Sequence, residues 1–196
     1  MKALLINISD TASREKLSAA LEMPVSPIVL HGEGSAVPPP RLEGLFGFSL
    51  PITGVLDGPL DGLWAEAFLA CDLIFAKPRA ELVFSDGCLW PALLGLRVSG
   101  ASSRRPLFSR RRLSFSEMER AGWARRGGAR EAVEWTEGKS AQAQRLLRPL
   151  LYREQGLSEA ACLALERSAF GLAWAGSDAR EGARSFLEKR LPSFSP

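Results

Sequence analysis

The stretch Asp57–Asp86, DGPLDGLWAEAFLACDLIFAKPRAELVFSD, decides the fold of this chain. It opens with Asp-Gly-Pro, a combination typical of turns. Asp61 is a residue type that caps helices, so we expect a helix from about Gly62 to Ala70. The apolar runs Leu73–Ala76 and Leu82–Phe84 that follow have the length of buried strands. A helix set between short buried strands indicates an α/β protein.

The segments before this stretch continue the alternation of strands and helices. Apolar runs predict strands at Ala3–Ile8, Ile28–Leu30 and Ile52–Leu56. A helix is expected over Ala12–Leu21, because Ser9-Asp10-Thr11 offers capping side chains in front of it. These segments extend the α/β pattern to the N-terminal part of the chain.

The C-terminal part is predicted to be mainly helical. A capping box at Ser114–Glu117 predicts a helix that ends at Gly122. The charged, Gly-rich run Arg125–Gly138 is interpreted as a seam, that is, a connecting segment between the α/β part and the helical part. The apolar spacing beyond it predicts three further helices: Ala141–Tyr152 with an interruption at Pro149, Glu159–Trp174, and a last one from a capping box at Asp178 to Arg190.

Length and composition favour one compact body with a substantial core. The chain has 196 residues, 46% of them hydrophobic, and its apolar runs are shorter than the ~18 residues that span a membrane. Met1–Ile8 is expected to be a first strand rather than a signal peptide. Cys71, Cys88 and Cys162 form no paired motif, which favours reduced thiols and a cytoplasmic location. His31 is the only histidine, so no metal site is predicted.

Basic residues are concentrated in the segment Arg104–Arg130, although the net charge is only +3. Such a segment can bind phosphates or an acidic partner, and it can equally be a solvated surface. It lacks the interleaved aromatic residues and the modules typical of nucleic-acid binding, which disfavours nucleic acid as a partner.

Three parts of the chain share the motifs of one known family. Leu69–Ala76, LACDLIFA, matches the second half of a signature in which a helix leads into a strand. Arg112–Trp123 matches a turn from a strand into a short helix that ends in Ala-Gly, and Cys162–Arg190 matches a helical C-terminus. In these parts the chain resembles the crotonase (enoyl-CoA hydratase/isomerase) superfamily. The resemblance implies a crotonase-like α/β spiral of ββα units over residues 1–130. It also implies a helical region over residues 131–196 that serves oligomerisation and covers the site.

The resemblance also assigns roles to individual residues. Reactions of this superfamily stabilise a thioester oxyanion with two backbone amides, one of them at the start of a helix, and use carboxylates as acid and base. Glu66 and Asp86 fall at the positions of the catalytic acids. Leu63 falls at the helix-start amide, and Pro39, within one residue, falls at the other amide position.

One of the two amide positions cannot act as a donor. Proline carries no N–H, and further prolines flank Pro39 on both sides. The loss of one oxyanion donor costs about 3 kcal/mol, or roughly 10²- to 10³-fold in rate. Leu63 keeps its N–H, but Leu63 and Trp64 stand where the superfamily has glycines. Trp64 and Trp174 are candidates for the wall of a substrate pocket, with the core as the alternative.

These features lead to three hypotheses of function. The first is a protein of this superfamily that associates with acyl thioesters through a degenerate site with weak or no catalysis. The second is an active hydratase, isomerase or decarboxylase that uses Glu66, Asp86 or both as acid and base. The third is nucleic-acid binding by Arg104–Arg130. His31 is more typical of a loop or a strand end than of a base.

The expected partners follow from the resemblance. We expect a homo-trimer or hexamer, or a hetero-oligomer with an active crotonase, and an acyl carrier protein is a candidate to dock on Arg104–Arg130. No cofactor is predicted apart from the ligand itself, an acyl-CoA or acyl-carrier thioester, and no membrane association is predicted.

Overall fold

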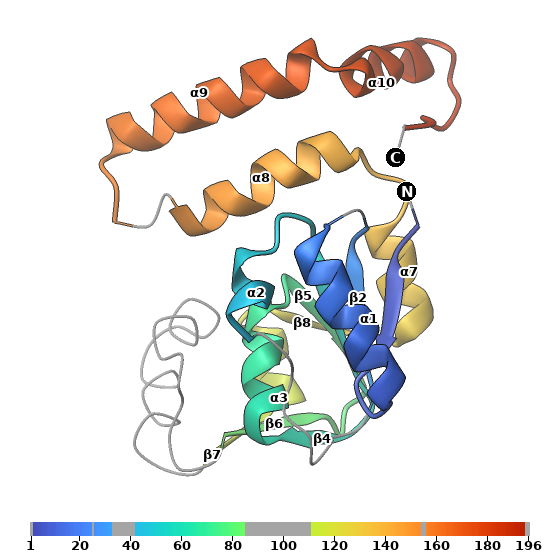
Figure 1. Ribbon diagram of the computed structural model, residues 1–196, viewed down its shortest axis with the longest axis vertical. Coiled ribbons are helices and arrows are strands. Elements are labelled where there is room, and N and C mark those ends of the chain that lie inside the picture. The colour runs from blue at the N-terminus through green and yellow to red at the C-terminus, as the bar shows by residue number, and fades with distance from the viewer. Residues whose placement is uncertain (1, 25, 33–41, 85–110, 154–155, 195–196) are drawn as a thin grey trace.

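The computed structural model of the chain describes residues 2–24, 26–32, 42–84, 111–153 and 156–194. Within this part an α/β core lies beneath three helices, which are α8 (Ala141–Arg153), α9 (Glu159–Ala175) and α10 (Ser177–Leu187) (Figure 1). The core therefore comes from the N-terminal two thirds of the chain, and the helices above it come from the end.

The larger sheet of the core, sheet A, is parallel. Among the described residues its strands lie in the order β1 (Leu4–Asn7), β2 (Ile28–His31), β3 (Ile52–Leu56), β5 (Leu73–Ala76) and β8 (Ala124–Arg126). The smaller sheet, sheet B, has the order β4 (Pro59–Asp61), β6 (Glu81–Phe84) and β7 (Arg111–Ser114), with β6 parallel to β4 and antiparallel to β7. The chain passes repeatedly from one sheet to the other, which confirms the predicted α/β class.

The helices pack on the faces of the two sheets. They are α1 (Thr11–Glu22), α2 (Leu42–Gly47), α3 (Gly62–Ala67) with its 3₁₀ continuation η1 (Phe68–Ala70), α6 (Phe115–Arg120) and α7 (Ala129–Thr136). Two of the predicted caps are present. The Asp10 carboxylate accepts a hydrogen bond from the Ala12 amide at 3.1 Å, and the Glu117 carboxylate accepts one from the Ser114 amide at 3.0 Å.

Alternate residues of the strands of sheet A point to opposite faces of the sheet and pack into two separate hydrophobic clusters. Ile28, Leu30 and Ile74 join the large cluster that also contains α3, η1 and the buried residues of sheet B. Val55 and Phe75 point to the opposite face, where Ala132 of α7 completes a smaller cluster. Sheet A is thus covered on both faces, as expected for a parallel sheet.

The start of α3 differs from the prediction. Asp57-Gly58-Pro59 was expected to be a turn, but Pro59–Asp61 is strand β4, because it pairs with β6 in sheet B. Asp61 stands at the N-cap position of α3, yet its side chain makes no capping hydrogen bond. The predicted helix to Ala70 is present in two parts, because the last turn tightens to a 3₁₀ helix.

Three predictions about the C-terminal part were also wrong. The seam predicted at Arg125–Gly138 contains β8 and α7, which pack into sheet A. Pro149 does not interrupt α8, since the helix continues through it at the loss of one backbone N–H. Asp178 does not cap α10, which begins at Ser177; its carboxylate instead accepts a hydrogen bond from the Ser140 hydroxyl at 2.5 Å.

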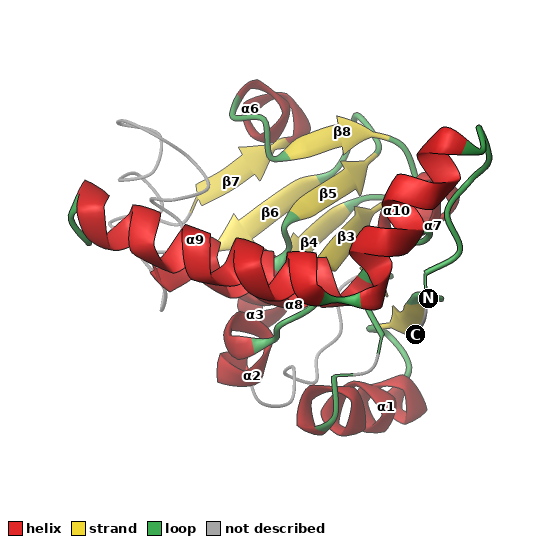
Figure 2. Ribbon diagram, turned by 90° about the horizontal axis from the view of Figure 1, so that it is seen from above, coloured by secondary structure: helices red, strands yellow, loops and turns green. Residues whose placement is uncertain are grey.

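The helices at the C-terminus form an arm, defined here as residues 156–194, which holds α9 and α10. All residues of α9 are described, and none of them is buried. Figure 2 shows α9 lying along α8, on the side of α8 that faces away from sheet A. The predicted division at residue 130 falls inside α7 and stays a prediction.

Candidate functional site

The start of helix α3 carries two of the predicted site residues. Gly62 has a left-handed φ of +60°, a conformation that suits glycine, and it leads the chain from β4 into the helix. Leu63 is 39% exposed, whereas Glu66, three residues on, is 5% exposed. Because residues three apart share one side of a helix, Leu63 lies at the open end of that side and Glu66 at its closed end.

Glu66 is a buried acid among apolar neighbours. Trp64, Ala65 and Ala67, which flank it on α3, all belong to the large hydrophobic cluster. Acids are seldom buried to this degree outside paired or functional positions. The acid/base role that the resemblance assigns to Glu66 stays a prediction from the sequence.

The other two members of the predicted site, Asp86 and Pro39, lie outside the described residues. Their roles as second acid and as amide position without a donor stay predictions from the sequence. Among the predicted site residues, the structure therefore brings together Leu63 and Glu66 on α3.

His31 lies at the end of β2, as the sequence predicted for a strand-end residue. Burial lowers the pKa of its imidazole below the usual value, although the nearby Asp57 carboxylate acts in the opposite direction. The carboxyl edge of a parallel sheet is a common place for ligands in α/β folds. At neutral pH His31 accordingly presents a neutral imidazole at this edge.

The two candidate tryptophans lie in different parts of the molecule. Trp64 is 1% exposed and belongs to the core, so the alternative of a core residue is the one that the structure supports. Trp174 is 68% exposed on α9, where its ring stacks on Phe170 with centroids 5.8 Å apart. Trp174 and Phe194 line a cavity of about 200 Å³ between the start of α8 and the two C-terminal helices.

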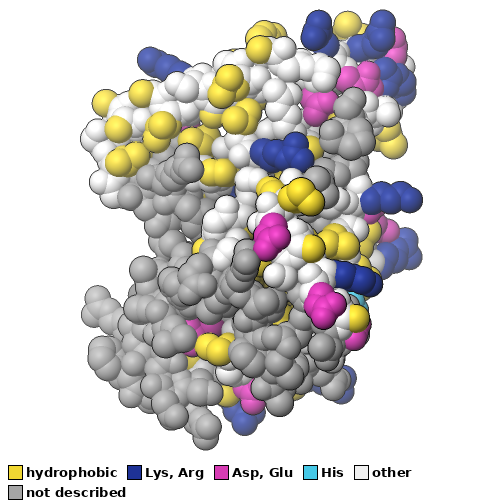
Figure 3. Space-filling model, viewed as in Figure 1, with side chains coloured by type: hydrophobic (Ala, Val, Ile, Leu, Met, Phe, Trp, Pro, Cys, Tyr) yellow, Lys and Arg dark blue, Asp and Glu magenta, His cyan; other side chains and the backbone are white. Residues whose placement is uncertain are grey.

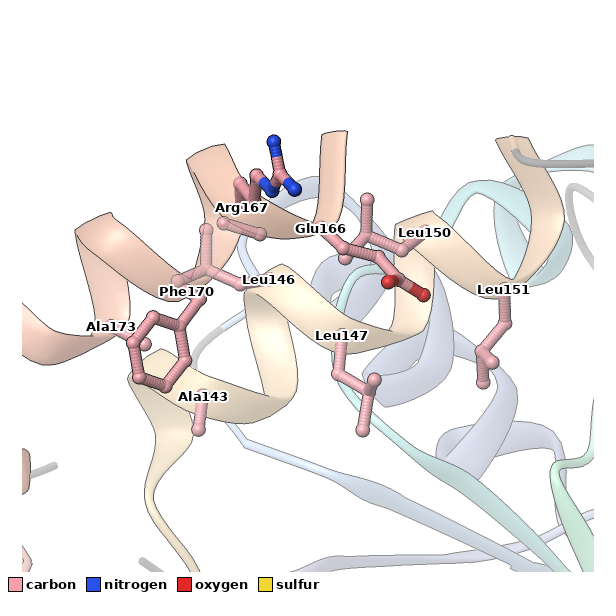
Figure 4. A pocket seen from close by; sticks show the side chains of 10 residues that line it. Ala143, Leu146, Leu147, Leu150, Leu151, Glu166, Arg167, Phe170 and Ala173 are labelled. Carbon is pink, nitrogen blue, oxygen red and sulfur yellow. The ribbon is translucent and has the colours of Figure 1, made fainter. Parts of the chain in front are cut away.

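A larger groove between α8 and α9 was missed by the sequence analysis. Its volume is about 550 Å³, and leucines of α8 face Phe170 and Ala173 of α9 across it (Figure 4). Figure 3 shows hydrophobic side chains gathered over these helices. The signal in the sequence was the low charge of Glu159–Ala175. Because this helix is apolar on all sides, other parts of a protein must cover it on more than one side.

The basic segment is described only from residue 111 onward. There, two of its arginines are in ion pairs: Arg112 with Glu81 at 2.9 Å and Arg130 with Glu134 at 2.8 Å. Arg125 and Arg126 on β8 are exposed. The positive charge of the described half of the basic segment is therefore partly neutralised. Arg125 and Arg126 are the residues of this half that are candidates to bind an acidic partner.

Among the described residues there is neither a metal-binding cluster nor a membrane-spanning helix. In that part of the chain no three His, Cys, Asp or Glu side chains cluster in a way that could hold a metal ion. Nor does any helix there have the length and apolar character needed to cross a membrane. The predicted absence of a metal stays a prediction.

The described geometry is that of an α/β protein in which α3 leads from β4 of sheet B to β5 of sheet A, with Leu63 near its start and the buried Glu66 one turn later. No family model matches the chain. It is 30% identical over 169 residues to a probable enoyl-CoA hydratase of Bacillus subtilis, a match that covers 78% of this chain and 66% of that protein.

Solved structures agree with this relationship. The fold matches a probable enoyl-CoA hydratase/isomerase from Mycobacterium abscessus with a TM-score of 0.82 at 18% identity, over 99% of this chain and 94% of that one. It matches an enoyl-CoA hydratase from Polaromonas sp. JS666 with a TM-score of 0.80 at 20% identity, over 99% and 96% of the two chains. The chain belongs to the crotonase (enoyl-CoA hydratase/isomerase) superfamily, and the predicted crotonase-like fold is confirmed.

Proposed function

We propose that this protein binds acyl thioesters, carried by CoA or by a carrier protein, at the start of α3, and that its catalysis is weak or absent. The observation that carries the proposal is the arrangement of Leu63, 39% exposed at the start of α3, above the buried Glu66. An amide at a helix start and an acid one turn later are two of the groups that thioester enolate chemistry uses; the second oxyanion amide is the one that Pro39 lacks.

The relatives support the choice of ligand. The Bacillus subtilis protein and the two structural neighbours are all named as enoyl-CoA hydratases or hydratase/isomerases. The chain spans 66% of the length of the Bacillus subtilis protein, so the ligand is transferred to this chain as part of the proposal.

Two features support weak catalysis. Pro39 has no N–H to give to an oxyanion. Leu63 adds a branched side chain where the superfamily has glycine, and this residue remains partly open to solvent. Trp64, the second bulky replacement, is buried in the core and does not narrow the approach. The obstruction is thus assigned to Leu63 and the missing donor to Pro39.

The test is a panel of enoyl-, 3-hydroxyacyl- and malonyl-type CoA thioesters, incubated with the pure protein and analysed by mass spectrometry. Binding is measured in parallel by isothermal calorimetry. We expect saturable binding with little product, and weaker binding for a Leu63→Asp variant, which places a negative charge beside the thioester carbonyl oxygen. The absence of binding to every thioester would reject the proposal.

A second candidate is an active hydratase, isomerase or decarboxylase. The specific observation in its favour is that Glu66, at the superfamily's catalytic-acid position, is kept on α3 at 5% exposure. Turnover that disappears in both Glu66→Gln and Asp86→Asn, with binding retained, would establish this candidate over the first.

We also propose that the arm is covered by further copies of the chain, in a homo-trimer or hexamer, or by an active crotonase in a hetero-oligomer. Phe170, Leu172 and Trp174 are 65%, 60% and 68% exposed on α9, and a helix that is apolar on all sides needs such cover. Light scattering after size-exclusion chromatography should give an oligomer that Phe170→Glu dissociates, with Glu166→Gln as control. A monomer for the unmodified protein would reject homo-oligomers.

An acidic acyl carrier protein is proposed to use Arg125 and Arg126, which are exposed at the edge strand β8. Charge reversal to Arg125→Glu and Arg126→Glu should weaken carrier binding while leaving the binding of CoA thioesters unchanged. Equal carrier binding by the reversed variant would reject this part of the proposal.

A further inference from the structure

A buried guanidinium joins α8 to the far end of the site helix. Arg148 is 3% exposed. Its Nε lies 2.8 Å from Oδ2 of Asp72, its Nη2 donates to the Ala70 carbonyl oxygen at 2.9 Å, and its Nη1 donates to the Phe48 carbonyl oxygen. A single side chain from α8 therefore contacts two separate segments of the α/β core, at Phe48 and at residues 70–72.

Two of these contacts lie at the C-terminal end of the helical segment that carries the site, one on its last residue and one just beyond it. Ala70 is the last residue of η1, which continues α3, and Asp72 follows two residues later. The same Asp72 Oδ2 accepts a hydrogen bond from the Ile52 amide at 2.9 Å, so the ion pair also reaches the start of β3. These contacts at the C-terminal end of residues 62–72 fix the position of this segment relative to sheet A.

The charge of Arg148 suits this place. The carbonyl end of a helix carries partial negative charge, which a buried cation stabilises, and the planar fork of arginine can serve the carboxylate and two carbonyls at once. Lysine has one point charge and cannot reproduce this geometry. The fork, and not only its charge, fixes the segment.

From these contacts we propose that Arg148 is a positioning residue for the site on α3. It holds the C-terminal end of the helical segment. The Leu63 amide at the N-terminal end and the Glu66 carboxyl in the middle are thereby kept in position. Since α8 also carries Leu147 and Leu150 of the α8–α9 groove, the same helix links the site to the arm. The proposal rests on the proposed function for its binding readout.

The test compares Arg148→Lys with Leu17→Ala, which truncates a fully buried core residue on α1 and lowers stability without removing any contact of Arg148 with Asp72, Ala70 or Phe48. Binding of crotonyl-CoA is measured well below both melting temperatures, and hydrogen exchange of the amides in residues 62–70 is measured without ligand. We expect Arg148→Lys to weaken binding by at least ~10-fold and to speed exchange in this segment selectively, whereas Leu17→Ala does neither.

The outcomes separate this proposal from the proposed function. If the unmodified protein binds no thioester but Arg148→Lys still speeds exchange in residues 62–70, the positioning role stands and the proposed function fails. Unchanged exchange and binding in Arg148→Lys overturn the positioning role. If Arg148→Lys does not fold, Asp72→Asn decides by the same two measurements, because it removes the charge that Arg148 binds while keeping the shape of the side chain.

Discussion

The indole N–H of Trp123 donates a hydrogen bond to the carbonyl oxygen of Cys71 at 3.0 Å, and both residues are buried. Trp123 directly precedes β8 and Cys71 lies just before β5, so this bond stands at the start of the pairing between these two strands. It explains why an aromatic residue with an N–H occupies this place.

We predict that Trp123→Phe lowers the free energy of unfolding by about 1–3 kcal/mol, because it removes a donor in the interior while keeping a ring. Urea denaturation followed by circular dichroism measures the change. Trp174→Phe, at a residue that is 68% exposed, is the matched control and should change stability by less than about 0.5 kcal/mol.

Gly54 in β3 cannot accept a side chain without displacing its neighbours. A Cβ on this residue would lie 2.7 Å from Phe68 Cε1 and 3.2 Å from Cys71 Sγ. Gly54→Ala should therefore cost about 1–3 kcal/mol of stability, and a second change, Phe68→Leu, should recover part of this loss. Gly58→Ala, where nothing lies within 4 Å, is the control in the same denaturation experiment.

The stability of the protein should fall as His31 is protonated. Burial lowers the pKa of His31 in the folded state, so its contribution is present above the unfolded pKa of about 6.5 and is lost as the pH falls through the lower, folded value. His31→Gln should flatten this part of the pH dependence. The chain has one histidine, so its NMR titration is free of overlap; a pKa at or above 6.5 would contradict the prediction.

The carboxyl group of Glu181, which is paired with Arg190, should titrate at low pH. Hydrogen bonds from Arg190, the shorter at 2.6 Å, and from the Ser193 amide lower the pKa of the Glu181 carboxyl to about 2. Its contribution is present above the unfolded pKa and is lost as the pH falls from about 4.5 towards 2. Carbon-13 NMR of the side chain should show this value, and Arg190→Gln should raise it.

Restoring the two amide positions should raise turnover. Pro39→Ala supplies an N–H, and Leu63→Gly opens the approach to the amide at the start of α3. If the proposed weak catalysis arises from these residues, the double variant should convert a thioester at least ~10²-fold faster than the unmodified protein, by mass spectrometry. Adding Glu66→Gln should abolish the gain; no gain in the double variant would show that other residues limit the rate.

Four strands of sheet A, β1, β2, β3 and β5, were predictable because each is an apolar run, whereas β8, with the sequence Ala-Arg-Arg, was not. Ile52–Leu56 and Leu73–Ala76 have the predicted bounds. Strand β4 was not predictable, since it is short, begins with a proline and exists through its pairing with β6. Likewise, Pro149 was expected to break α8, but Arg148 beside it is held in the core by its contacts with Asp72 and two carbonyl groups.

Of the candidate site, the sequence supplied Leu63 and Glu66 through the resemblance; the structure places both on α3, Leu63 exposed and Glu66 buried, and their roles stay predictions. Nothing in the sequence indicated that Arg148 binds Asp72, because 76 positions separate them and an arginine in a predicted helix is ordinarily solvated. The fold alone brings such residues together. Trp174 was expected in a pocket wall or in the core, and either place would have covered its side chain with other parts of the same chain. In the structure it lies on α9, on the outside of the molecule.

The strand order of sheet A bears on how the protein is made. β5 and β8 are neighbours in the sheet, but the chain between them must first travel through β6, β7 and α6. During synthesis, β5 is an open edge until residue 126 has left the ribosome, and open edges invite association with other chains. Ribosomes that pause within this interval should therefore yield aggregates, whereas pauses after α7 should release a core with both faces of its main sheet already covered.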